Sequence, residues 1–232
     1  MESKGFSLLE LLVVLAVMGV MMAVLGFTFL TNSSSDLGNT QRALLSYIQK
    51  TKSLSVSSGA EARLIVSADH ENPEKYLRHL QIIVLDKNYS NELQQWAIAD
   101  SGFYLPKDVW FIADGCGSEN SDLPRSAQCA WSASDQDDYF RLKLVKNNNN
   151  NKVFEQSSEG QPFLYLSCLP SGKISCPTYP KMPKLIFAKG KMVPSSSGDF
   201  IPAFPDSSQV AGIQILPFGG TLSLETADFA DE

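Results

Sequence analysis

The chain has 232 residues and a formal net charge of −6 at pH 7, from 19 basic and 25 acidic side chains. A surface that binds nucleic acid needs a basic excess to displace counterions, so this acidic balance argues against nucleic acid as a partner. The sequence contains no phosphate-binding loop, dinucleotide motif, zinc-protease motif or hydrolase serine motif. We therefore expect neither an enzyme nor a bound cofactor or metal.

The first 30 residues combine a short polar leader with a long apolar run. From Leu11 to Leu30 no side chain is charged, and a helix of that length spans roughly 30 Å, the thickness of a bilayer core. Glu10 lies just before this run, where an acid costs less than it does at the bilayer centre. A conventional signal peptide has a basic start, a shorter apolar stretch and a small-residue cleavage site, which fit poorly here. We expect residues 6–30 to cross the membrane.

The segment Lys4–Glu10 reads Lys-Gly-Phe-Ser-Leu-Leu-Glu. It resembles the prepilin signal of type IV pilins and type II secretion pseudopilins. In that family a membrane peptidase cuts after the glycine and methylates the new N-terminus. The resemblance implies that residues 1–5 are a leader, that cleavage separates Gly5 from Phe6, and that Phe6 becomes N-methylated. It also implies that Glu10 acts in filament assembly. An ordinary signal anchor, with Glu10 facing lipid headgroups, is the alternative interpretation.

Residues 31–59 are predicted to continue as an amphipathic helix. Asp36 can cap the segment, and Gly59 stands where a helix C-terminus favours glycine. Residues on one face recur at steps of three and four, as a helix packed on a sheet requires. They are Leu37, Leu44, Leu45, Ile48, Thr51, Lys52 and Ser55. This helix end and the strand expected at Ala62–Val66 resemble minor pilins of the FimT and pseudopilin H type.

Beyond Gly59 the pattern is that of β-strands. Short apolar or alternating runs are separated by polar loops, which include the asparagine run 147–151. Strands are expected at residues 62–66, 80–85, 95–99, 109–112, 139–144, 163–166, 185–188, 213–216 and 221–224. With the resemblance, this pattern predicts an α+β, pilin-like fold. A long N-terminal helix packs on an antiparallel β-sheet domain over residues 60–232, which we expect in the periplasm.

The four cysteines form two pairs that are close in sequence, Cys116 with Cys129 and Cys168 with Cys176. Four cysteines allow three connectivities, and local pairing is the simplest because each pair brackets a turn-rich segment. Such disulfides fit an oxidising compartment such as the periplasm. Zinc is the competing interpretation, but neither spacing is that of a zinc knuckle and both histidines are distant in sequence.

These features predict a minor pilin or pseudopilin subunit, anchored once in the inner membrane and transferred to a filament on assembly. The expected partners are prepilin peptidase, other pilin or pseudopilin subunits, the inner-membrane assembly platform and membrane lipid. A type II secretion pseudopilus and a type IV pilus both fit, the latter serving DNA uptake or adhesion as an alternative. An envelope binding protein held by a signal anchor is the alternative from another class, and it would not need cleavage at Gly5.

Overall fold

The structure is a computed structural model of the whole chain. It describes residues 36–87, 94–112, 140–147, 150–175, 184–195, 198–206, 208–216 and 219–229. The chain divides into two compact units, Met1–Asp36 and Leu37–Glu232. The predicted transmembrane segment 6–30 lies outside the described residues, and no helix within them is long and apolar enough to cross a membrane.

A single helix, residues 36–58, opens the described part of the chain. Its buried face consists of Leu37, Thr40, Leu44, Ile48, Thr51 and Ser55, which confirms the predicted packing face. Small hydroxyl side chains toward the C-terminal end let the helix approach the neighbouring backbone closely. Gly59 follows the last helical residue with φ of +60°, as predicted for a glycine that ends a helix.

The larger sheet closes on itself. Its six main strands are β1 (Ala62–Ser67), β2 (His79–Leu85), β3 (Gln95–Ile98), β7 (Lys152–Gln156), β6 (Phe140–Lys146) and β8 (Gln161–Cys168). They pair antiparallel in that order, and β1 also pairs with β8, so the strands form a ring. Two short strands are attached, β4 (Phe103–Tyr104) to β2 and β9 (Ile174–Ser175) to β8.

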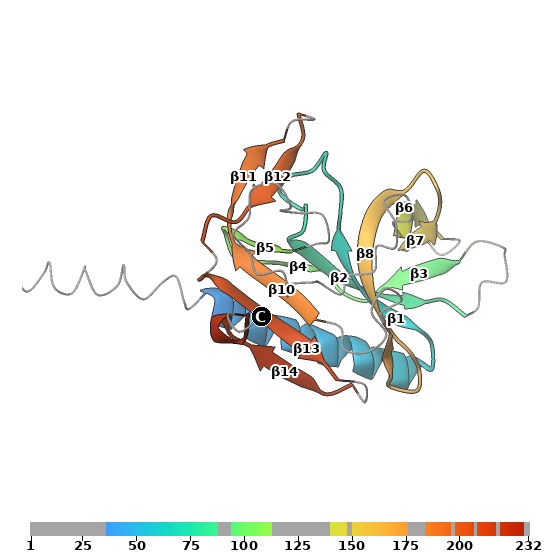
Figure 1. Cartoon of the computed structure of the whole chain (residues 1–232). Helices are drawn as coiled ribbons and strands as arrows, with labels where there is room; N and C mark the ends of the chain where they lie inside the picture. The colour runs from blue at the N-terminus through green and yellow to red at the C-terminus, as the bar shows by residue number, and fades with distance from the viewer. Residues whose placement is uncertain are drawn as a thin grey trace, which may run out of the picture. The chain divides into compact units, whose positions relative to one another are not determined.

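A second sheet and a ribbon complete the domain. The four-stranded sheet runs β14 (Thr221–Leu224), β13 (Val210–Ile215), β10 (Lys184–Lys189) and β5 (Val109–Phe111). The ribbon pairs β11 (Lys191–Pro194) with β12 (Phe200–Ala203), and the 3-10 helix η1 covers Thr226–Phe229. Figure 1 shows the helix running alongside β13 and β14, with the β11–β12 ribbon projecting on the other side of the domain.

The domain has two apolar cores. The larger one joins the helix, the four-stranded sheet and one face of β1, β2 and β8, and includes Leu44 and Phe187. The smaller one fills the inside of the strand ring. It consists of Ile65, Ile83, Trp96, Phe140, Leu142, Phe154 and Phe163. Strand β1 contributes to both, because Leu64 faces the larger core and Ile65 the smaller one. A strand buried on both faces explains the continuous apolar run Leu64–Val66.

The predicted combination of one helix with an antiparallel β domain is confirmed for the described residues. All nine predicted strands are present, and their ends differ from the predicted ones by at most three residues. The 95–99 segment pairs with the 80–85 segment as a hairpin, as expected. Asn147, Asn150 and Asn151 lie between β6 and β7 and belong to neither strand, while residues 148–149 of the predicted loop lie outside the described residues. Four strands were missed: β4, which has two residues, and β7, β11 and β12. The two-residue strand β9 is not among the nine ranges, but it lies in the turn-rich segment expected between Cys168 and Cys176.

Candidate functional site

Most of the residues predicted to act in processing and assembly lie outside the described part of the chain. These are Gly5, Phe6, Glu10, Cys116, Cys129 and Cys176. Cys168 is described: it ends β8, is fully buried, and has no cysteine partner among the described residues. Burial raises the pKa of its thiol to about 12. The turn-rich segment that Cys168 and Cys176 bracket does connect β8 to β9. Cys176 is the residue after β9 and lies outside the described residues, so its pairing with Cys168 stays a prediction.

The helix is fixed to both sheets by polar side chains. Near its start, the Gln41 Nε2 donates to the carbonyl oxygens of Gly212 at 2.8 Å and Leu224 at 3.2 Å. Near its end, the Ser55 hydroxyl lies 2.8 Å from the Ala60 carbonyl oxygen and 2.7 Å from that of Cys168. Backbone oxygens of the sheets thus have hydrogen-bond partners near both ends of the helix. The helix is therefore a fixed part of the β domain from Leu37 onward.

One arginine points into the strand ring. The guanidinium carbon of Arg63 on β1 lies 4.3, 4.5 and 4.3 Å from the ring centroids of Trp96, Phe140 and Tyr165. The Arg63 Nε donates to the Glu61 Oε1 at 2.7 Å. The Arg63 side chain is 14% exposed, so the cation–π contacts form with little water around the charge.

Glu61 completes this cluster from the other side. Its carboxylate also accepts a hydrogen bond from the Ser167 hydroxyl on β8. Since Arg63 and Ser167 face each other in the β1–β8 register, the carboxylate links the two strands that close the ring. Sequence reasoning missed this cluster. Its only signal is a single basic residue at an inward position of the apolar strand Ala62–Val66.

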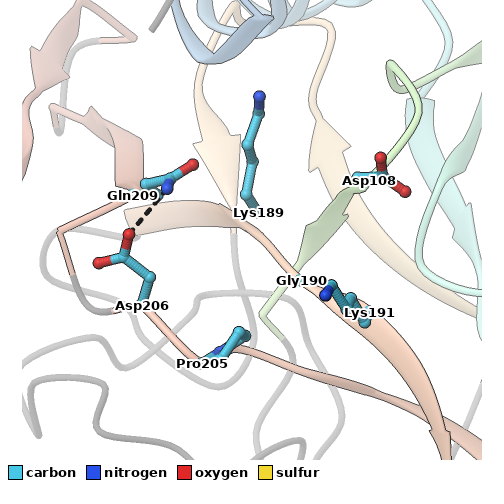
Figure 2. Close-up of a pocket in the computed structure, with 7 residues that line it drawn as sticks. All are labelled: Asp108, Lys189, Gly190, Lys191, Pro205, Asp206 and Gln209. Carbon is cyan, nitrogen blue, oxygen red and sulfur yellow. Dashed lines mark hydrogen bonds between the residues drawn. The ribbon is translucent and has the colours of Figure 1, made fainter. Parts of the chain in front are cut away.

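A shallow pocket of about 230 Å³ lies at the base of the β11–β12 ribbon (Figure 2). Its lining combines two aspartates, two lysines and three uncharged residues: Asp108, Lys189, Gly190, Lys191, Pro205, Asp206 and Gln209. Figure 2 shows the Asp206 carboxylate turned to Gln209, whose Nε2 donates to it at 2.7 Å. Hydrogen bonds from Ser208 and Gln209 lower the pKa of Asp206. The Asp206 carboxylate is therefore already hydrogen-bonded to residues of its own loop.

The described residues include neither a metal-binding cluster nor a reactive thiol. No group of three or more His, Cys, Asp or Glu side chains among them could hold an ion. The only described thiol is buried and protonated at neutral pH, and a nucleophile would need it ionised. The polar clusters found here instead hold the domain together.

Comparison with known proteins addresses the N-terminus directly. Residues 1–28 match the family model of the prokaryotic N-terminal methylation motif. The chain carries an N-terminal methylation motif over the segment that resembles the prepilin signal. Among solved structures, the chain is similar to the minor pseudopilin EpsH from the Type 2 Secretion System of Vibrio cholerae. The alignment covers 82% of this chain and 96% of that one, at 13% identity and a TM-score of 0.39. No curated protein matches the chain.

The match supports the prepilin-type interpretation of the segment Lys4–Glu10. Its 28 residues include the predicted cleavage junction, Glu10 and most of the apolar run.

Proposed function

We propose that this chain is a minor pilin or pseudopilin subunit that is cut by prepilin peptidase, held in the inner membrane by residues 6–30 and assembled into a filament. The observation that carries the proposal is the N-terminal methylation motif over residues 1–28. Protein secretion through a type II pseudopilus is the role we favour, and a type IV pilus is the close competitor. The β domain lies in the periplasm in either case.

In this mechanism the peptidase cuts after Gly5 and methylates the new amine of Phe6. The apolar helix then leaves the bilayer and packs among the helices of other subunits. Glu10 enters an apolar bundle there, and a buried carboxylate must be paired or neutralised. The methylated amine of Phe6, on the same or a neighbouring chain, is the natural partner. Burial of the apolar run supplies affinity, and this ion pair sets the axial register.

The described domain would serve as the rigid globular domain of such a subunit. Gln41 and Ser55 fix its helix at both ends, and a force or contact applied to the N-terminal part of that helix is therefore passed to the sheets. The closed strand ring leaves few free edges for unspecific pairing. The expected partners are the assembly platform and neighbouring subunits.

Intact-mass analysis of the full-length protein extracted from membranes tests the proposal. We expect a mass lower by residues 1–5 and higher by one methyl group, located on Phe6 by fragmentation. A variant with Gly5 replaced by a bulky residue serves as the control and should keep its full leader. Mature wild-type protein that begins at Met1 would show an ordinary signal anchor and overturn the proposal.

A further inference from the structure

The described strands protect their edges in several ways. The six strands of the ring have partners on both sides, and β4 and β9 are only two residues long. At β5 the outward Phe111 N–H donates to the Leu77 carbonyl oxygen at 3.0 Å. An unprotected edge is a template for another chain, which proteins commonly avoid with short strands, charges or proline.

The isolated β11–β12 ribbon is protected by proline. The Ser195 N–H donates to the Asp199 carbonyl oxygen at 2.7 Å, which sets the alternation of inward and outward backbone groups along the ribbon. In the observed register, the backbone groups of residues 194 and 202 then point away from the partner strand of the ribbon. Both are proline and lack an N–H. Neither edge of the ribbon can therefore accept a full additional strand.

Strand β14 has none of these protections, although it is the outer strand of its sheet (Figure 1). The Leu216 N–H donates to the Gly220 carbonyl oxygen at 2.8 Å. The same alternation turns the N–H and C=O of Thr221 and Ser223 outward, where no described residue bonds to them. Residues 213–224 contain no charged side chain and β14 contains no proline. Leu222, between the two outward residues, is 50% exposed.

We propose that two copies of this chain pair through β14, antiparallel about a two-fold axis at Leu222. In this register Thr221 of one copy faces Ser223 of the other. Both present outward backbone groups, so each such pair exchanges two hydrogen bonds. The two Leu222 side chains meet in a narrow, non-hydrogen-bonded pair and cover each other. The four-stranded sheets of both copies join into one continuous sheet.

Charge complementarity favours a second copy over an unrelated strand. Continuing the register places Glu225 of one copy opposite Gly219 of the other. A Cβ on Gly219 would lie 2.7 Å from the Lys52 Nζ, so the Lys52 ammonium lies beside that position. Glu225 is exposed, and two-fold symmetry brings it next to Lys52 of the other copy at both ends of the contact. The contact is isologous and closes as a dimer. This proposed dimer does not depend on the proposed function.

Cysteine cross-linking of the full-length protein in detergent tests the register. Opposed residues of a non-hydrogen-bonded pair lie about 4.5 Å apart between Cα atoms, within the range for a disulfide. Leu222→Cys should therefore give a disulfide-linked dimer under mild oxidation. Ser223→Cys is the matched control, because the two copies of residue 223 are diagonal neighbours about 7–8 Å apart and cannot be bridged. Wild-type protein, oxidised in the same way, gives the background cross-linking that comes from the native cysteines.

Equal cross-linking of both variants would overturn the register. Cross-linking of Leu222→Cys in membranes to a protein of different mass would show that another subunit supplies the strand, and would overturn the second copy as occupant. A Leu222→Cys protein that stays monomeric at all concentrations would overturn the site itself.

Two further variants separate pairing from folding. Ser223→Pro removes an outward N–H from each copy but no bond to β13, so we expect a dimer dissociation constant about 10- to 100-fold higher with unchanged thermal unfolding of the monomer. Lys52→Glu should also weaken the dimer, and adding Glu225→Lys should restore it. Sedimentation in detergent measures both effects. An unchanged dissociation constant in Ser223→Pro, or no rescue in the double variant, would contradict the proposal.

Discussion

Arg63 and Glu61 form an ion pair at 2.7 Å within the polar cluster of the strand ring, with side chains only 14% and 22% exposed. Both lie on or beside β1, the strand that pairs with β2 on one side and β8 on the other. The pair thus stands where the ring closes. A second ion pair, Lys143–Glu159, spans 3.8 Å at the surface, with side chains 57% and 82% exposed.

These two pairs allow a matched test of the cluster. Arg63→Ala removes the ion pair and three aromatic contacts, and leaves Glu61 without its cation. We expect the free energy of unfolding to fall by about 2–4 kcal/mol. Lys143→Ala is the control and should change it by less than about 0.5 kcal/mol. Denaturant unfolding of both proteins measures the difference. Equal, small effects would show that the Arg63 cluster adds little stability.

The sequence predicted five of the six strands of this ring, but neither β7 nor the closure of the ring. Alternation in residues 139–144 and the apolar run 80–85 indicate strands with buried faces, and both segments form strands from residue 140 and residue 79 onward. In β6 the buried face covers Phe140 and Leu142 but not Leu144, which is 51% exposed. Ring closure depends on β7, which follows the asparagine run. Only Val153 and Phe154 of its five residues are apolar, so the segment gives little periodic signal. Arg63 was missed because a basic residue in a strand is ordinarily taken as solvent-facing. Its inward position is favourable because of the Glu61 carboxylate and three aromatic rings, which come from strands distant in sequence.

A second prediction concerns pH. Burial lowers the pKa of His79 from its ordinary 6.5, Lys75 lowers it further, and Asp100 opposes both. The folded state therefore binds this proton less readily than the unfolded chain. Stability is fully present above pH 6.5 and falls as pH drops from there through the folded pKa.

The variant His79→Gln isolates this contribution. We expect a weaker loss of thermal stability below about pH 6.5 in the variant than in the wild type, because glutamine does not titrate. His70 is present in both proteins, so the comparison isolates position 79. Identical pH profiles would mean that His79 is not the group responsible.

The disulfides are the third prediction. We expect non-reducing peptide mapping to recover Cys116 with Cys129 and Cys168 with Cys176. The register places Cys168 opposite Ile174, so the bridge needs the chain to turn toward β8 just after β9. Closing so short a loop stabilises by roughly 2–3 kcal/mol. Cys176→Ala should therefore lose about that much in oxidising buffer and nothing under reducing conditions. Crossed pairs, or four free thiols, would disprove local pairing.

The last prediction tests the role of Glu10 in assembly. Glu10→Ala makes the membrane segment more apolar, so insertion should persist. Cleavage should also persist, because the scissile bond after Gly5 lies five residues away. Incorporation into the filament should fall, since the Phe6 amine of a neighbouring subunit loses its partner in an apolar setting. Removing one member of a buried pair costs about 3–5 kcal/mol, a large loss for each subunit.

Co-purification with the major subunit, at native expression, measures that loss. Glu2→Ala provides the matched control, because Glu2 belongs to the leader that cleavage removes, and its loss should leave incorporation unchanged. A subunit at the filament tip has no neighbour above it, and the effect of Glu10→Ala should then be smaller than for a subunit within the shaft. If the variant is cleaved and incorporated as well as the control, Glu10 does not set the register. The helix then packs through its apolar surface alone.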